Sequence, residues 1–139
     1  MFLLDTNVVS ELRKVRAGRA DHNVQRWATG AAASSLFLSV IVVRELEIGT
    51  LLAERRDPAS GAILRIWLKS HVLPTFAERI LPVDLAVALR SAALHVPDPR
   101  PARDGLIAAT ALVHGFTVVT RNTNDFASTG VRLINPWQE

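Results

Sequence analysis

Short uninterrupted apolar runs alternate along the chain with longer segments in which apolar residues recur at helical spacing. Runs of three or four apolar residues are typical of buried strands, and a period near 3.6 is typical of helices with one buried face. The pattern predicts strands at residues 2–4, 36–38, 80–83, 117–120 and 131–134. It predicts helices over residues 6–14, 21–29, 40–55, 59–73, 85–95 and 101–114.

Residues at the expected helix ends support these boundaries. Ser39 and Asp84 stand where N-caps are expected, Pro101 suits a first helical position, and Gly115 is typical of a helix stop. Apolar strands separated by helices indicate a parallel sheet covered on both faces. We therefore expect a three-layer α/β/α fold with a central parallel sheet of about five strands. In such sheets ligands bind outside the carboxyl ends of the strands.

Composition fits this single domain over residues 1–139 and excludes some chemistry. Hydrophobic residues make up 49% of the chain, which allows a substantial core, and there is no cysteine. Disulfides, thiolate metal sites and cysteine nucleophiles are thereby excluded. The longest uncharged stretch, residues 27–43, contains glycine, threonine and serine, and no signal-peptide pattern opens the chain. We expect a cytoplasmic protein without a membrane segment.

The positive charge of the chain is almost entirely arginine. Of 16 basic residues only Lys14 and Lys69 are lysine, and the formal net charge is +3. Arginine binds phosphate groups in a bidentate manner, so the composition suggests nucleic-acid binding. Ordinary surface charge is an equally good interpretation of the composition alone.

Three aspartates are expected at the carboxyl edge of the sheet. Asp5 follows the first strand, Asp104 lies in the first turn of the helix over residues 101–114, and Asp125 follows the fourth strand. Each has a structural alternative, as a helix N-cap, as an acid favoured by the helix dipole, and as a turn residue.

A fourth acid, Glu45, lies within the apolar arc of the helix over residues 40–55. At 100° per residue it falls in line with Ile41, Ile48 and Leu52, whereas Glu47 lies on the opposite face and is expected to be solvated. A glutamate on a buried stripe requires a partner, so a functional role or a salt bridge with an arginine is expected.

Four acids from four elements would meet at one edge of the sheet. Two carboxylates about 5 Å apart repel by roughly 3 kcal/mol at an effective dielectric constant near 20, so several of them need a cation to stay ionised. A ligand set made only of oxygen selects a hard ion such as Mg²⁺ or Mn²⁺. Such an ion activates water and neutralises phosphate charge, which indicates phosphodiester hydrolysis.

Four segments of the chain resemble those of a known family. DTNVVSELRK, SVIVVRELEIG, RDGLIAATALVHG and VVTRNTNDFASTGVRLINPW are similar to segments of the PIN-domain ribonucleases, and more closely of the VapC/FitB-type toxins of prokaryotic toxin–antitoxin pairs. The resemblance covers nearly the whole chain, and it matches the four family acids to Asp5, Glu45, Asp104 and Asp125. It matches supporting polar positions to Thr6, Asn7, Thr120 and Asn122.

This resemblance implies a Mg²⁺- or Mn²⁺-dependent endoribonuclease in which water attacks phosphorus and leaves a 5′-phosphate and a 3′-hydroxyl. It also implies homodimerisation, inhibition by a cognate VapB-type antitoxin, and a higher assembly with antitoxin and operator DNA. For RNA phosphates we consider the basic residues near the first helix and the fourth strand, with a solvated turn as the alternative; these are Arg13, Lys14, Arg16, Arg19 and Arg121.

The chain departs from the family pattern at two positions. Arg44 stands where a small residue is common, and it lies off the apolar arc, so little effect is expected. Gly105 stands where a larger residue is common, and it is expected to loosen the start of its helix. The scattered histidines His22, His71, His95 and His114 are expected to be structural, and Trp27, Trp67 and Trp137 are expected to pack in the core or at an interface.

Two other functions remain as alternatives. An aspartyl-phosphate phosphatase of the haloacid-dehalogenase type would use Asp5 as its nucleophile. That family places a second acid two residues later, where this chain has Asn7, and it needs a lysine beyond the third strand, where this chain has none. A nonenzymatic PIN-like scaffold that binds RNA or a partner is the other alternative, although a purely RNA-binding cleft has no reason to gather acids.

Overall fold

The computed structural model describes residues 1–138. Its centre is a five-stranded parallel sheet with the strand order β3-β2-β1-β4-β5. The strands are β1 (Phe2–Leu4), β2 (Leu36–Ser39), β3 (Ile80–Leu81), β4 (Thr117–Val119) and β5 (Leu133–Ile134). The helices are α1 (Thr6–Leu12), α2 (His22–Gly30), α3 (Val40–Arg56), α4 (Pro58–Trp67), α5 (Leu73–Thr75), α6 (Leu85–Leu94) and α7 (Ala102–His114). The predicted parallel sheet between helical layers is confirmed.

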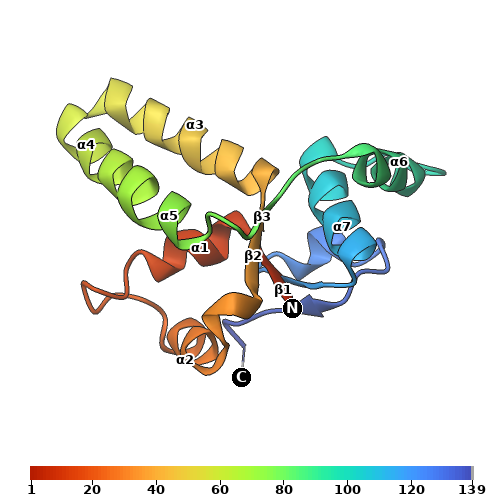
Figure 1. Ribbon diagram of the computed structural model, residues 1–139, viewed down its shortest axis with the longest axis horizontal. Helices are drawn as coiled ribbons and strands as arrows, with labels where there is room; N and C mark the ends of the chain where they lie inside the picture. The colour runs from red at the N-terminus through yellow and green to blue at the C-terminus, as the bar shows by residue number, and fades with distance from the viewer. Residues whose placement is uncertain (139) are drawn as a thin grey trace.

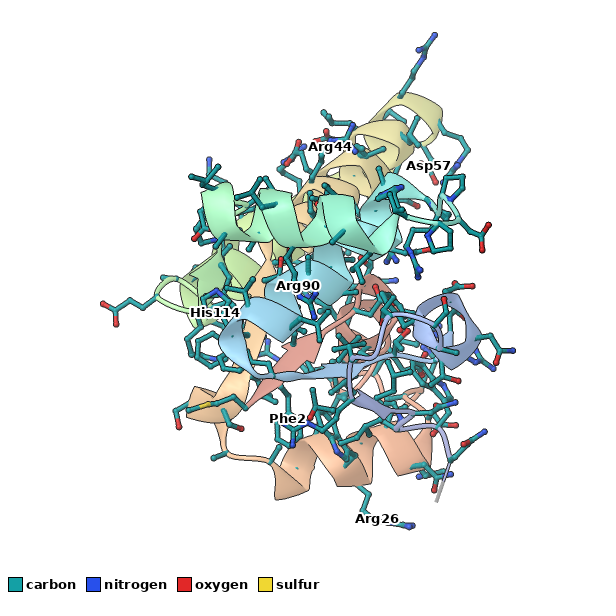
Figure 2. All side chains as sticks on the ribbon, turned by 90° about the vertical axis from the view of Figure 1, so that its right-hand side faces the viewer. Phe2, Arg26, Arg44, Asp57, Arg90 and His114 are labelled. Atoms are coloured by element: carbon teal, nitrogen blue, oxygen red, sulfur yellow. The ribbon has the colours of Figure 1, made fainter. Side chains whose placement is uncertain are left out.

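Helices lie on both sides of the sheet, as Figure 1 shows. The long helix α3 turns back into α4, and these two helices form an arm on one side of the strands, while α6 and α7 pack together on the other. Helix α2 lies near the amino-terminal end of β1. Figure 2 shows Phe2 between the sheet and this helix, and its ring meets that of Trp27 edge to face with centroids 5.3 Å apart.

The strands are buried because both of their faces are covered. Leu3, Leu4, Leu38, Val118 and Val119 have no exposed surface, and the core also contains buried side chains from α1, α3 and α7. Register places Leu4 beside Val119, so the residues that follow β1 and β4 emerge next to each other. The predicted burial of α7 is confirmed, since Asp104, Gly105 and residues 107–111 are buried.

Several predicted boundaries differ from the structure by one to three residues. The first helix ends at Leu12, because residues 13–19 fold back in successive turns. The helix predicted over residues 59–73 begins at Pro58 and passes through a π-helical turn, Leu68–Val72, before it ends at Thr75. Pro101 is the N-cap of α7 and lies one position before the first helical residue.

The prediction of which face of α3 is buried is also corrected. The buried face of α3 carries Val42, Leu46 and Ala53, whereas Ile48 and Leu52 are exposed, because the neighbouring line of residues is the one that faces the core. Gly105 is buried within α7, which is helical from Ala102 onward, and a weaker helix start at this position stays a prediction. No helix in the described residues has the length and apolar content that crossing a membrane requires.

Candidate active site

Asp5 lies at the carboxyl end of β1, fully buried, beside the end of β4. Its backbone N–H donates to the carbonyl of Val119 at 2.9 Å, which extends the strand pairing by one residue. Its Oδ1 accepts from the N–H of Thr6 at 2.7 Å, and its Oδ2 accepts from the hydroxyl of Thr120 at 2.7 Å. Asp5 is therefore an N-cap of α1 and also a charged group fixed at the sheet edge, so the two interpretations of this residue hold together.

Glu45 reaches the same place from α3. Although this residue lies beside the buried stripe rather than within it, its side chain is only 30% exposed. The hydroxyl of Thr6 donates to Oε1 of Glu45 at 2.6 Å. Thr6 thus connects the first acid to the second, since its backbone contacts Asp5 while its side chain holds Glu45. The expectation that Glu45 lies at the carboxyl edge of the sheet is borne out by these contacts.

Asp104 completes a group of three acids. It lies in the first turn of α7 and is 7% exposed. Hydrogen bonds from one arginine, Arg103, reach this carboxylate and those of Asp5 and Glu45, so three elements that are distant in the sequence each bring one carboxylate to the carboxyl end of β1.

A single arginine, Arg103, stands among these three carboxylates. Its Nε donates to Oε2 of Glu45 at 2.7 Å, its Nη1 donates to Oδ1 of Asp104 at 2.9 Å, and its Nη2 donates to Oδ1 of Asp5. Burial by itself lowers the pKa of the Arg103 guanidinium, but the hydrogen bonds to the three acids and the charge of Asp5 outweigh burial and raise that pKa above its ordinary value. The group is a four-membered ionic cluster.

Sequence reasoning did not single out Arg103. It required a cation for the acids and allowed an arginine partner for Glu45, but it did not choose among the 14 arginines of the chain. Its position in the sequence could have identified it, because Arg103 directly precedes Asp104 in the first turn of a helix whose following residues are small or apolar. A charged side chain at the mouth of such a helix lies beside the acids that gather there.

The chemical type of the donor atoms fits a hard divalent ion. Asp5, Glu45 and Asp104 offer oxygen atoms only, which are the ligands that Mg²⁺ and Mn²⁺ prefer. The guanidinium among them marks the position as one that holds positive charge. Within residues 1–138, however, no three acidic or histidine side chains are arranged to hold an ion as they stand. The carboxylates are spaced around the guanidinium, which is wider than an ion.

The supporting polar residues form a short network around Thr120. The hydroxyl of Thr120 accepts from the N–H of Asn122 at 3.0 Å and lies 3.5 Å from Nδ2 of Asn7. Oδ1 of Asn7 accepts from the N–H of Arg121 at 3.3 Å. The loop after β4 is thereby tied to the start of α1, and Thr120 is oriented toward Asp5.

Asp125 lies apart from the three clustered acids. It is exposed in the 3-10 turn Thr123–Phe126, which follows the fourth strand and agrees with the alternative of a turn residue. In the described structure its carboxylate makes no hydrogen bond or ion pair with the cluster, and its backbone N–H donates to Asn122. The structure brings Asp5, Glu45 and Asp104 together, and it does not bring Asp125 into contact with them.

The basic residues after α1 line a hollow of about 460 Å³ between this segment and α4. Ile63, Ile66 and Trp67 form its apolar wall, and the basic residues are Arg13, Lys14, Arg16 and Arg19. A neighbouring hollow of about 270 Å³ is lined by Thr6 and Glu45, and Arg13 and Trp67 line both. The basic cluster is thus continuous with the surface beside the acids.

Arg121 lies elsewhere, with its guanidinium 5.2 Å from the centre of the Trp137 ring. The three tryptophans are partly buried and pack against the core, as expected.

Glu47 differs from its expectation, because it is only half exposed and accepts hydrogen bonds from Arg65 at 2.6 and 2.8 Å. These hydrogen bonds from Arg65 lower the pKa of Glu47 below its ordinary value. Arg44 is exposed on α3, in agreement with its position off the apolar arc (Figure 2).

The comparison with protein families decides where the chain belongs, because a model described as PIN domain matches residues 2–131. The chain belongs to the PIN-domain family. Among curated relatives it is 40% identical to "VapC ribonuclease Y4jK" of Sinorhizobium fredii, in an alignment of 143 positions that covers 99% of both chains. It is 38% identical to "Toxin FitB" of Neisseria gonorrhoeae, with 100% of both chains covered.

Solved structures of the family agree with the fold described above. The PIN domain superimposes on a chain of the FitAcB structure from Neisseria gonorrhoeae with a TM-score of 0.89 at 36% identity and full coverage of both chains. It matches a chain of the structure titled "Structure of FitAB bound to IR36 DNA fragment" with the same TM-score at 35% identity, covering 100% of this chain and 97% of that one. The fold and the family expected from the four sequence segments are confirmed.

Proposed function

We propose that this PIN-domain chain is a ribonuclease toxin that hydrolyses RNA phosphodiester bonds and is neutralised by a cognate antitoxin. The observation that carries the proposal is the convergence of Asp5, Glu45 and Asp104 from β1, α3 and α7 on one point at the edge of the sheet. Acids drawn from three separate elements are more than any single N-cap or helix-dipole role requires. Full-length similarity to a ribonuclease and to a toxin supports the same function.

We infer that the reaction depends on Mg²⁺ or Mn²⁺ held by Asp5, Glu45 and Asp104, with Asp125 as a fourth acid farther out. When bound, such an ion supplies a water of lowered pKa and neutralises the charge that develops on the phosphodiester. Hydrolysis that breaks the bond from phosphorus to the 3′ oxygen leaves a 5′-phosphate and a 3′-hydroxyl. The oxygen-only donor set supports this choice of ions.

The hydroxyl groups of Thr6 and Thr120 orient the acids in this scheme. Thr120 fixes one oxygen of Asp5 and Thr6 fixes one oxygen of Glu45, at 2.7 and 2.6 Å. A carboxylate held in this way presents its other oxygen in one direction and does not need to reorganise when its ligand arrives. Asn7 and Asn122 act one step farther out, through their contacts with Thr120.

The basic hollow is the proposed path of the RNA backbone. Its arginines and Lys14 line a surface that continues to the acids through Arg13. Contacts from arginine and lysine to phosphates supply affinity without reading sequence. Arg121, in the loop after β4, is proposed to contact the RNA backbone as well.

The proposed partners follow from the relatives. The solved structures include FitAB bound to a DNA fragment and a "Toxin-antitoxin complex from Klebsiella pneumoniae", which matches at 26% identity with a TM-score of 0.66. We propose that this chain likewise pairs with a VapB-type antitoxin, forms a homodimer, and enters a higher assembly on operator DNA.

The decisive experiment is cleavage of total RNA by the purified, partner-free chain in Mg²⁺, in Mn²⁺ and in EDTA. We expect discrete fragments that require metal and disappear in Asp5→Asn, Glu45→Gln and Asp104→Asn. Glu47→Gln is a matched control for Glu45→Gln, since it removes an acid from the same helix outside the cluster. If the three site variants fold and cut at the wild-type rate, the site assignment is wrong.

A nonenzymatic scaffold is the second candidate, and one observation favours it. The three acids already have a partner in Arg103, so their presence does not by itself demand a metal ion. Growth inhibition in cells that is unchanged by Asp5→Asn together with Asp104→Asn would support binding without cleavage.

A further inference from the structure

We propose that Arg103 is an internal cation that occupies the acidic site and that a divalent metal ion must displace in order to bind. The proposal rests on the proposed function, because it takes Asp5, Glu45 and Asp104 to be the metal-binding acids. It adds a competitor for the metal ion that belongs to the same chain.

The guanidinium uses a different nitrogen for each acid. Nε contacts Glu45, Nη1 contacts Asp104 and Nη2 contacts Asp5, so the planar group lies between all three carboxylates rather than beside one of them. This arrangement places its positive charge where the acids converge. A surface salt bridge between one arginine and one acid would leave that point open.

The carboxylate oxygens that remain are too few for a metal ion. Arg103 takes one oxygen from each acid, Thr120 takes the second oxygen of Asp5, and Thr6 takes the second oxygen of Glu45. Among the described hydrogen bonds only Oδ2 of Asp104 has no partner. Because Mg²⁺ and Mn²⁺ need directly bound oxygens at about 2.0–2.2 Å, the ion and the guanidinium compete for the same atoms.

The position of Arg103 allows it to leave without disturbing the fold. Its side chain is 31% exposed, and its backbone lies in the first turn of α7, at the end of the helix that faces the acids. Rotation about the side-chain bonds moves the guanidinium toward solvent while α7 and Asp104 stay in place. Glu45 and Asp5, by contrast, remain bound to the hydroxyl groups of Thr6 and Thr120.

Competition of this kind lowers the apparent affinity for the ion by the fraction of time that the site is free of the guanidinium. If that fraction is between roughly one in ten and one in a hundred, removal of the guanidinium tightens metal binding by about 10- to 100-fold. The ion, in turn, must release Arg103 in the wild-type chain. Both effects are measurable without RNA.

The test compares Mn²⁺ binding by calorimetry to the metal-free full chain in three forms: wild type, Arg103→Met and Arg44→Met. Methionine keeps an apolar stem at position 103 and removes the charge, and Arg44 is an exposed control on α3. We expect Arg103→Met to bind Mn²⁺ at least tenfold more tightly than wild type and Arg44→Met to bind equally. Equal or weaker binding by a folded Arg103→Met overturns the proposal.

A second measurement uses the wild-type chain and does not depend on the variant. The Nε–H of Arg103 donates to Glu45, so we expect it to give a nitrogen-15 NMR signal distinct from those of solvated arginines and slow to exchange with water. We expect saturating Mg²⁺ to move this signal to the position of a solvated arginine. If the signal is unchanged while Mg²⁺ is bound, the ion does not displace the guanidinium and the proposal fails.

These outcomes separate the inference from the proposed function. If wild type and Arg103→Met bind Mn²⁺ with equal affinity and Asp5→Asn abolishes that binding, the metal site stands and the role of Arg103 is wrong. If neither wild type nor Arg103→Met binds Mn²⁺, both the metal dependence proposed for the ribonuclease and the inference about Arg103 are wrong.

Discussion

The close contact between α3 and α4 predicts that one substitution has opposite effects at two glycines. Gly61 of α4 is buried, and a Cβ atom there would lie 2.3 Å from the Cα of Glu54 and 2.6 Å from its backbone nitrogen, both in α3. Gly49, in the middle of α3, is exposed and has nothing within 4 Å of the corresponding position. Alanine therefore has room at Gly49 and has none at Gly61.

The expected magnitudes follow from these distances. Carbon atoms in contact lie about 3.5–4.0 Å apart, so Gly61→Ala forces the two helix backbones apart by more than 1 Å and costs about 1–3 kcal/mol. Gly49→Ala gains about 0.5–1 kcal/mol, because alanine loses less backbone entropy in a helix. For a chain of this length 1 kcal/mol corresponds to roughly 3 °C in Tm. The two variants should differ in Tm by about 5–12 °C.

The assay is thermal unfolding followed by circular dichroism, on partner-free wild type and both variants at one protein concentration. We expect the order of Tm to be Gly49→Ala, wild type, Gly61→Ala. A Gly61→Ala chain as stable as wild type would mean that α3 and α4 are not in backbone contact at this position. That result would refute the close packing of α3 against α4. It would not bear on the higher helix propensity of alanine over glycine, which Gly49→Ala measures separately.

Three further predictions concern the site and the pH dependence. Thr120→Val removes a buried hydroxyl donor from Asp5 and should cost about 1.5–3 kcal/mol, against about 1 kcal/mol for Thr120→Ser, which keeps the donor; equal losses in urea unfolding would contradict this contact. The backbone N–H of Asp21 lowers the pKa of Glu11, so Glu11 stabilises the fold above pH 4.5 and this stability is lost as the pH falls through the lowered pKa. Glu11→Gln should therefore lose less stability than wild type between pH 6 and pH 3 in urea titrations, and an identical loss would contradict the assignment. Mg²⁺ at about 100 times its Kd should add about 2.7 kcal/mol of stability, or roughly 8 °C in Tm, to wild type and nothing to Asp5→Asn; the same shift in both would place the ion elsewhere.

Sequence reasoning predicted the sheet because its strands are buried on both faces. In a strand such as β1 or β4, polar and apolar residues do not alternate. The short, mainly apolar run is therefore enough to predict a buried strand from the sequence. The parallel order then put Asp5 and Thr120 at one edge, where they share a hydrogen bond. Helix ends were less predictable, since the chain after Leu12 continues in successive turns closed by hydrogen bonds between residues three to five positions apart, and the apolar pattern does not mark where the helix gives way to these turns.

The face of a helix that meets the core was harder to predict than the helix itself. Apolar residues nearly encircle α3, so periodicity allowed either of two adjacent lines to be the buried one. Packing of α4 against α3 and of α3 against the sheet selected Val42, Leu46 and Ala53. Glu45 lies beside this line at the border of the core, where it reaches both Thr6 and Arg103.

Arg103 changes the electrostatic argument for a metal site. Repulsion among gathered carboxylates requires a positive charge, and a sequence without other information assigns that charge to an ion. In this fold the guanidinium supplies it, so repulsion alone no longer decides between an ion and an arginine. The distinction depends instead on the reaction, because a guanidinium neutralises charge on a phosphate but does not lower the pKa of a water as a bound divalent ion does. If the proposed hydrolysis uses a water activated by a divalent ion, the site needs that ion as well as the acids, and because the chain keeps Arg103 among those acids it then needs a way to exchange one cation for the other.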